Sequence, residues 1–164
     1  MTRDIEIFRR QARMISQTVK TNLQGITHEE SLIQPQPGGN RINWVLGHLL
    51  NVYNRALPLL GQDPVMDEAP LKKYERGSPP LLDPGQAIPF EQLRASWDEA
   101  VKRVDAGLEN MSDELLDRPA PPGIPTEPGD TVRSVLSVLL FHQAYHAGQT
   151  AVLRRLTGRE GAIK

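Results

Sequence analysis

Apolar residues recur at alternating steps of three and four in four long segments of this 164-residue sequence. Such spacing places the apolar side chains on one face of a helix. The segments span residues 3–23, 41–60, 90–111 and 132–157. No stretch shows the alternation of a half-buried strand, and the chain is long enough to bury a core. The sequence therefore predicts an all-α fold, a four-helix bundle that residues 1–164 form as a single domain.

Capping residues indicate where several of these helices begin. Thr27 and Glu30 have the spacing of a capping box, which predicts a short helical turn after the first helix. Asn40 is the predicted N-cap of the second helix, and Asp130 or Thr131 is the predicted N-cap of the fourth.

Two connections between the helices are rich in proline, at residues 61–88 and 119–129. The first is longer than most connections inside a compact domain. We expect it to be a crossover or a flap over a site, although a disordered linker is an alternative. We also expect the two proline-rich loops to form the mouth of a substrate pocket. The apolar residues that would anchor the first loop are Leu71, Tyr74, Leu81 and Leu82.

Three histidines fall on the predicted inner faces of two helices. His142 and His146 are four residues apart in the fourth helix, so both rings point the same way, and they take places where Leu or Val is expected. His48 lies on or beside the inner stripe of the second helix. A buried imidazole without partners costs about 1–3 kcal/mol, and a shared metal ion would offset that cost. The alternative is three core histidines that hydrogen bond to one another and to water, whereas His28 is predicted to be solvated.

Composition excludes several classes of site and partner. The chain has no cysteine, which rules out disulfides and thiolate ligands. Its 19 basic and 20 acidic residues form no basic stripe, so we expect no nucleic-acid partner. The charged N-terminal stretch is unlike a secretory signal, and no apolar run reaches membrane length. We therefore expect a cytoplasmic protein with no membrane partner.

Two motifs resemble one family of small bacterial bundle proteins. INWVLGHLLN, at residues 42–51, and HQAYHAGQ, at residues 142–149, are similar to motifs of the DinB/YfiT-like superfamily. The resemblance implies an up-down-down-up bundle in which the second and third helices run parallel, joined by the long 61–88 connection. It also implies that His48, His142 and His146 bind a divalent metal ion, zinc or nickel, and that the protein is a homodimer.

Relatives of this kind use bacillithiol, mycothiol or a similar small thiol. The resemblance therefore implies a metal-dependent S-transferase that acts on a low-molecular-weight thiol, with no catalytic residue assigned beyond the ligands. A hydrolase that uses a metal-bound hydroxide is one alternative. A non-catalytic, stress-induced protein that binds metal or a small apolar ligand is another.

Residues around the histidines offer candidates for supporting roles, which the sequence does not assign. The possible hydrogen-bond acceptors for the outer ring nitrogens are Asn51, Asn54 and Gln149. The possible general bases are Glu30, Asp67, Glu68 and Tyr145.

Overall fold

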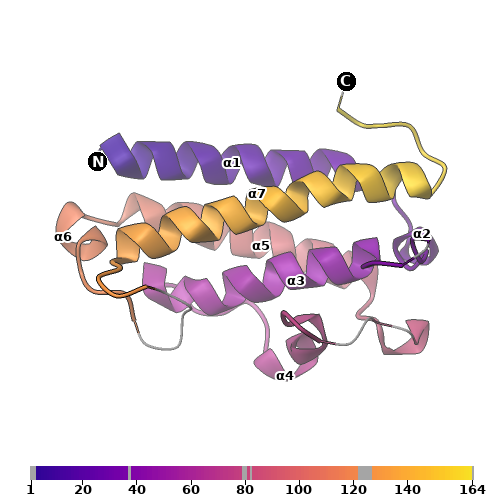
Figure 1. Ribbon diagram of the computed structural model, residues 1–164, viewed down its shortest axis with the longest axis horizontal. Coiled ribbons are helices and arrows are strands. Elements are labelled where there is room, and N and C mark those ends of the chain that lie inside the picture. The colour runs from indigo at the N-terminus through magenta and orange to yellow at the C-terminus, as the bar shows by residue number, and fades with distance from the viewer. Residues whose placement is uncertain (1–2, 37, 79–80, 82, 122–126, 164) are drawn as a thin grey trace.

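Four long helices form the bundle in the computed structural model, which describes residues 3–36, 38–78, 81, 83–121 and 127–163. They are α1 (Arg3–Leu23), α3 (Ile42–Ala56), α5 (Phe90–Glu109) and α7 (Val132–Leu156). Helices α1 and α7 run in one direction, and α3 and α5 run in the other (Figure 1). Each helix packs on two neighbours, because α1 contacts α5 and α7, and α3 contacts the same two helices. The predicted all-α bundle and its up-down-down-up order are confirmed.

Most helix ends follow the predicted capping residues. Thr27 and Glu30 form a capping box at α2 (His28–Ser31). Thr131 is the N-cap of α7, and its side chain accepts a hydrogen bond from the backbone N–H of Ser134. The prediction for α3 was wrong by one residue. The chain stays extended through Arg41, so Arg41 rather than Asn40 is the N-cap.

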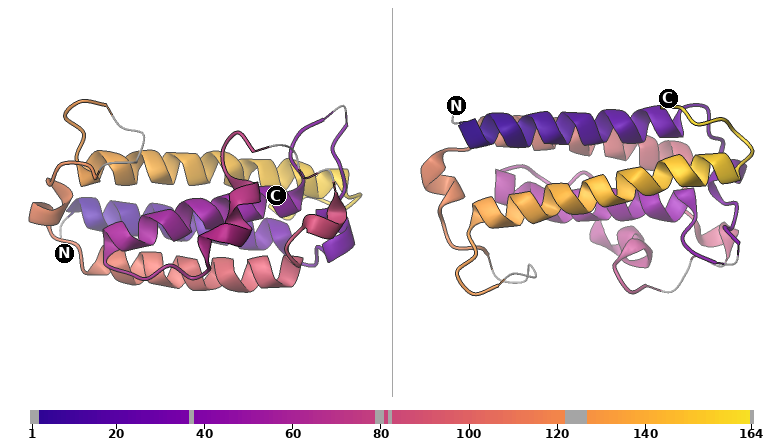
Figure 2. Two further views of the ribbon diagram at one scale, coloured as in Figure 1. Left: turned by 90° about the horizontal axis from the view of Figure 1, so that it is seen from below. Right: turned by 45° about the horizontal axis from the view of Figure 1, so that its top comes forward.

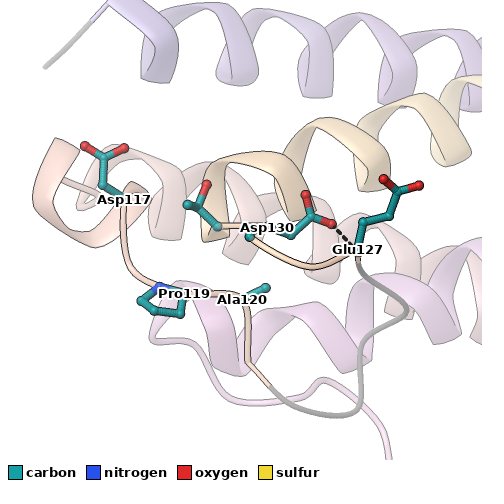
Figure 3. Close-up of a pocket in the computed structure, with 7 residues that line it drawn as sticks. Asp117, Pro119, Ala120, Glu127 and Asp130 are labelled. Atoms are coloured by element: carbon teal, nitrogen blue, oxygen red, sulfur yellow. Dashed lines mark hydrogen bonds between the residues drawn. The ribbon is translucent and has the colours of Figure 1, made fainter.

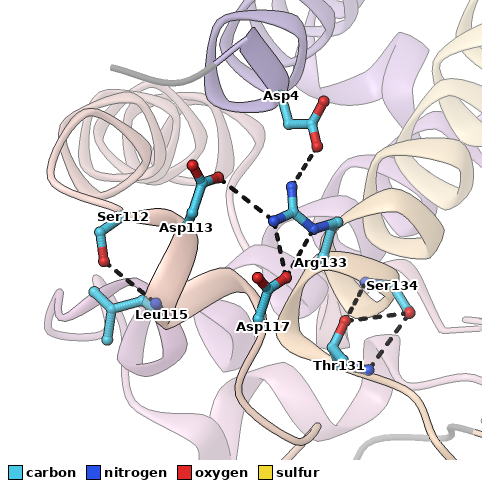
Figure 4. A network of polar contacts seen from close by, with 8 residues as sticks. All are labelled: Asp4, Ser112, Asp113, Leu115, Asp117, Thr131, Arg133 and Ser134. Atoms are coloured by element: carbon cyan, nitrogen blue, oxygen red, sulfur yellow. Dashed lines mark hydrogen bonds and ion pairs between the residues drawn. The ribbon is translucent and has the colours of Figure 1, made fainter.

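The arginine at the start of α7 joins three helices at one end of the bundle. Arg133 pairs with Asp117 at 2.8 Å, just beyond α6 (Asp113–Leu116), and with Asp113 at 3.5 Å. It also pairs with Asp4 on α1 (Figure 4). These side chains are 30–66% exposed, so each pair contributes little stability on its own, and together they fix the position of α6.

The long connection between α3 and α5 is a folded crossover in the part that the structure describes. It contains four short elements that follow the outer side of α3 (Figure 2). They are η1 (Leu57–Leu60), α4 (Glu68–Leu71), η2 (Lys72–Tyr74) and η3 (Pro84–Gln86). Of the predicted anchors, Leu71, Tyr74 and Leu81 are buried, and Leu82 lies outside the described residues.

Tyr74 is the main attachment of this crossover to the bundle. Its ring covers Gly47 of α3 so closely that a Cβ at residue 47 would lie 2.4 Å from a ring carbon. Its hydroxyl donates to Asn43 Oδ1 and accepts from the backbone N–H of Ile88, both at 2.9 Å. The Asn43 amide in turn donates to the Ile88 carbonyl at 2.9 Å. The buried polar groups of this contact are therefore paired, which holds the middle of the crossover, at Tyr74, and its C-terminal end, at Ile88, against α3.

Within the described part of the chain, none of the helices is both long and apolar enough to cross a membrane.

Candidate metal centre

Three imidazole rings meet where α3 packs on α7. His48 comes from the middle of α3, and His142 and His146 come from successive turns of α7. Taking one nitrogen from each ring, the three atoms lie within 4.8 Å of one another. The ring centroids are 4.6–5.0 Å apart. The structure thus brings together the three histidines that the sequence singled out.

Hydrogen bonds to the outer nitrogens set the orientation of two rings. His48 Nδ1 lies 2.7 Å from the Tyr74 carbonyl, and His146 Nδ1 lies 2.7 Å from Gln149 Oε1. Both oxygens only accept, so each Nδ1 carries the proton and donates it. The lone pair of each ring is then on Nε2, the nitrogen left for the cluster. This is the tautomer that metal-binding histidines adopt when an outer acceptor holds the ring.

The third ring shows why these residues fit a cation. His142 Nε2 lies 3.0 Å from His48 Nε2, which has no proton to donate. His142 Nδ1 is buried and has no hydrogen-bond partner among the described residues. A cation shared by the inner nitrogens would satisfy every lone pair that faces the cluster. Zinc–nitrogen bonds are about 2.0–2.1 Å long, so ligands of one ion lie roughly 3–4 Å apart. The 3.0 Å between the inner nitrogens of His48 and His142 is in this range, and all three nitrogens lie within 4.8 Å of one another.

Burial keeps all three rings in the neutral form that binds metals. Desolvation lowers the pKa of His48, although the Tyr74 carbonyl opposes the change. Desolvation also lowers the pKa of His146, against the effect of Gln149. The pKa of His142 falls to about 4, because burial acts together with the charges of His146, His48 and Arg76. The cluster includes no carboxylate of the described residues, so its three side chains bring no negative charge.

Aromatic side chains border the histidines. Trp44 stacks on His48 with ring centroids 4.7 Å apart and an interplanar angle of 12°. Tyr145 meets the His146 ring edge to face at 5.1 Å. Trp44 is buried, whereas Tyr145 is 60% exposed and its neighbour Phe141 is 73% exposed. The cluster therefore has a closed side formed by α3 and an accessible side on α7.

The two histidines of α7 lie at the edge of the core rather than inside it, which corrects the sequence interpretation. His142 and His146 are half-buried. The fully buried positions beside them are Gln143 and Ala147, and Gln143 donates to the Leu49 carbonyl at 3.1 Å. Because Gln143 is polar and Ala147 is small, the hydrophobic pattern of the sequence did not identify them as the buried positions of α7. The position of His142 and His146 at the edge of the core makes their rings accessible to a ligand.

The fourth histidine, His28, lies outside the cluster. The prediction that it is simply solvated was wrong. His28 is half-buried, and its Nδ1 accepts a hydrogen bond from the backbone N–H of Phe90 at 3.3 Å. It therefore supports the start of α5 rather than the metal centre.

Only one of the predicted acceptors supports a ring. Gln149 does so, whereas Asn54 bonds the backbone of Val65 and Met66 in the crossover. No hydrogen bond joins Asn51 to the rings in the described structure. Sequence reasoning missed the Tyr74 carbonyl, because a backbone acceptor in an irregular segment has no residue signature.

The candidate bases have no established role at the centre. Glu30 bonds the Thr27 backbone N–H and pairs with Arg159 at 2.9 Å. Neither Asp67 nor Glu68 influences the pKa of a ring. Tyr145 is the one candidate in contact with a histidine, and its contact is through the ring.

A separate open pocket lies beside the N-terminal end of α7. Its volume is about 320 Å³, and residues of the connection between α6 and α7 line it (Figure 3). These lining residues are Asp117, Pro119, Ala120, Glu127, Gly129, Asp130 and Thr131. None of the three clustered histidines takes part. The described residues of the second proline-rich loop thus line another hollow, and residues 122–126 lie outside the description.

The depressed histidine pKa values predict that acid destabilises the metal-free protein. An imidazole of the unfolded chain takes up a proton near pH 6.5, whereas folded His142 stays neutral until about pH 4. Protons therefore favour the unfolded state throughout that interval. We expect the free energy of unfolding, measured by urea denaturation after chelation, to fall from pH 7 to pH 4. A His142→Gln variant should lose less stability over this range. Parallel curves for the two proteins would contradict the assigned burial of His142.

Comparison with known proteins agrees with the fold. A family model described as the DinB superfamily matches residues 10–150. A crystal structure titled "conserved protein of locus from Enterococcus faecalis" is 16% identical. That match covers 97% of this chain and 100% of the other, with a TM-score of 0.74, and at this identity it supports the fold alone. None of the curated proteins matches the sequence. Because the family model spans most of the chain, the protein belongs to the DinB superfamily.

Proposed function

We propose that this protein is a metal-dependent S-transferase for a small thiol, with His48, His142 and His146 as the metal ligands. The observation that carries the proposal is a cluster of three neutral imidazoles without a carboxylate. Three such ligands leave a divalent ion its full charge and an open position, as in catalytic rather than structural sites. An ion held there would act as a Lewis acid and lower the pKa of a coordinating thiol.

The protein's own residues orient the ligands and limit the access of water. The Tyr74 carbonyl and Gln149 fix the tautomers of His48 and His146. Trp44 covers one face of His48, which limits the approach of water from that side. In the proposed reaction the thiolate sulfur forms a bond to an electrophilic carbon, and the leaving group departs with its electron pair.

The absence of a carboxylate favours this reaction over hydrolysis. A bound metal ion would ionise water to hydroxide, but after the attack the second proton must still reach the leaving group, and a carboxylate at the mouth would be its usual carrier. No described carboxylate belongs to the cluster. A thiol has one proton to lose and a pKa near 8.5, so metal coordination alone suffices to ionise it.

The ligand assignment predicts one divalent ion per chain, and we propose zinc or nickel, although imidazole also suits copper and iron. His142→Ala should lower metal affinity by at least roughly 100-fold, since losing a ligand exceeds the usual cost of losing a supporting group. Elemental analysis and competition with a chelator measure this effect. Circular dichroism should show an intact helical protein, because His142 is only half-buried.

His28→Ala is the matched control for this experiment. It removes an imidazole outside the cluster, so its metal content should equal that of the wild type. Full metal content in His142→Ala would show that the ligand assignment is wrong.

The thiol assignment predicts a spectral response in the cobalt-substituted protein. Adding bacillithiol, mycothiol, coenzyme A or glutathione in turn should produce a sulfur-to-cobalt charge-transfer band with at least one of them. Turnover of an electrophile should then require both metal and thiol. Hydrolysis of activated esters without thiol, lost on chelation, would support the hydrolase instead. Tight metal binding without either activity would support a non-catalytic metal-binding protein.

We also propose that the exposed side of α7 forms a homodimer contact. Val138, Phe141, Tyr145 and Val152 are 59–73% exposed and lie along one side of the helix. Contiguous apolar residues of this kind mark interaction sites. Sedimentation equilibrium should give twice the mass of the chain, and the double substitution Val138→Ser and Val152→Ser should shift it toward monomer. A monomeric wild type would exclude this contact.

A further inference from the structure

A tight turn at the end of η2 is built into the same wall as the histidines. The Ser78 backbone N–H donates to the Glu75 carbonyl at 3.0 Å, and Gly77 has the positive φ of 81° that such a turn requires. The Ser78 hydroxyl donates to the Lys73 carbonyl at 2.9 Å and accepts from the Trp44 indole N–H at 3.2 Å. Because Trp44 also stacks on the His48 ring, the position of the turn is fixed relative to the cluster.

Arg76 occupies the exposed tip of this turn. Arg76 is two residues after Tyr74, whose carbonyl accepts a hydrogen bond from His48. Its positive charge helps to lower the pKa of His142. No carboxylate pairs with Arg76 among the residues that the structure describes, whereas other arginines, such as Arg133 and Arg103, do have acidic partners.

The charges around the cluster define what kind of ligand it can take. Three neutral imidazoles, a divalent ion and Arg76 would together bring positive charge to the site, because no carboxylate belongs to the histidine cluster of the described residues. A thiolate supplies one negative charge at the ion. A guanidinium at the edge of the site suits a second negative group, because its planar donors pair with a carboxylate through two parallel hydrogen bonds.

We propose that Arg76 is a specificity-determining residue that binds the carboxylate of a small, carboxylate-bearing thiol. The inference rests on the proposed function, in which the sulfur of the same molecule takes the open position at the three histidines. Arg76 would select among thiols and contribute to binding rather than to the bond-making step.

The test compares two thiols that differ only in charge. 3-Mercaptopropionate carries a carboxylate where 3-mercapto-1-propanol carries a neutral hydroxymethyl group. Titration of the cobalt-substituted protein should show the carboxylate-bearing thiol binding roughly two- to fivefold more tightly, within the range for an accessible ion pair. Arg76→Gln should reduce this preference to about onefold. Lys72→Gln is the matched control, since it removes one positive charge from an exposed residue of η2, and it should leave the preference intact.

A second measurement separates this inference from the thiol chemistry. Propionate, which has no sulfur, should shift the NMR signal of the Trp44 indole N–H in the metal-free wild type and not in Arg76→Gln. If propionate shifts the Trp44 signal in this way but neither thiol changes the cobalt spectrum, Arg76 is supported as a carboxylate site and the S-transferase proposal is overturned. A cobalt response equal for both thiols, and unchanged in Arg76→Gln, would support the thiol chemistry and overturn the role of Arg76. No response in either measurement would overturn both.

Discussion

The contact between Tyr74 and Gly47 is the constraint on which the candidate site depends. A phenol ring fits against the backbone of α3 only because residue 47 has no side chain, as a Cβ there would lie 2.4 Å from the ring. The hydroxyl then pairs with Asn43 and Ile88, while the carbonyl of the same residue accepts from His48. One side chain therefore attaches the crossover to the bundle, and its own backbone orients a ring of the cluster. Fold stability and site geometry are coupled through a single residue.

Burial and hydrogen bonding leave the three imidazole rings arranged for a bound cation. Desolvation holds the imidazoles neutral, and two fixed acceptors direct the lone pairs of His48 and His146 toward the same place. His142 has no such support, since its outer nitrogen is buried without a partner in the described structure. An arrangement that leaves one buried polar atom unpaired costs about 1–3 kcal/mol, which the fold retains only where something else compensates. A cation among the inner nitrogens would satisfy the lone pairs that face the cluster and so offset part of this cost.

Helical periodicity was sufficient to predict the bundle and to place the three histidines together, since spacing determines which face of a helix a residue occupies. Periodicity did not predict which residues of α7 are buried, because contacts with neighbouring helices determine their burial. Gln143 and Ala147 form the buried stripe of α7 because Gln143 pairs with the Leu49 carbonyl, and a polar residue gives no apolar signal. Tyr74 and Arg76 both lie in the connection at residues 61–88, which has no hydrophobic periodicity. There, contacts made across the fold set the conformation, and the local sequence does not reveal them.

The up-down-down-up order explains why this aperiodic segment became part of the site. Parallel α3 and α5 need a connection that returns along the bundle (Figure 1), and this one packs on α3, where its Tyr74 carbonyl accepts a hydrogen bond from His48. The helices must keep their spacing to preserve the core, and they carry the three imidazoles. The crossover is anchored by several buried residues, among them Leu71, Tyr74 and Leu81, whereas the exposed side chain of Arg76, at the tip of its turn, can be replaced without disturbing the core. Residues on that turn, Arg76 foremost, are therefore where a bundle of this design can change the ligand it selects while keeping the same metal ligands.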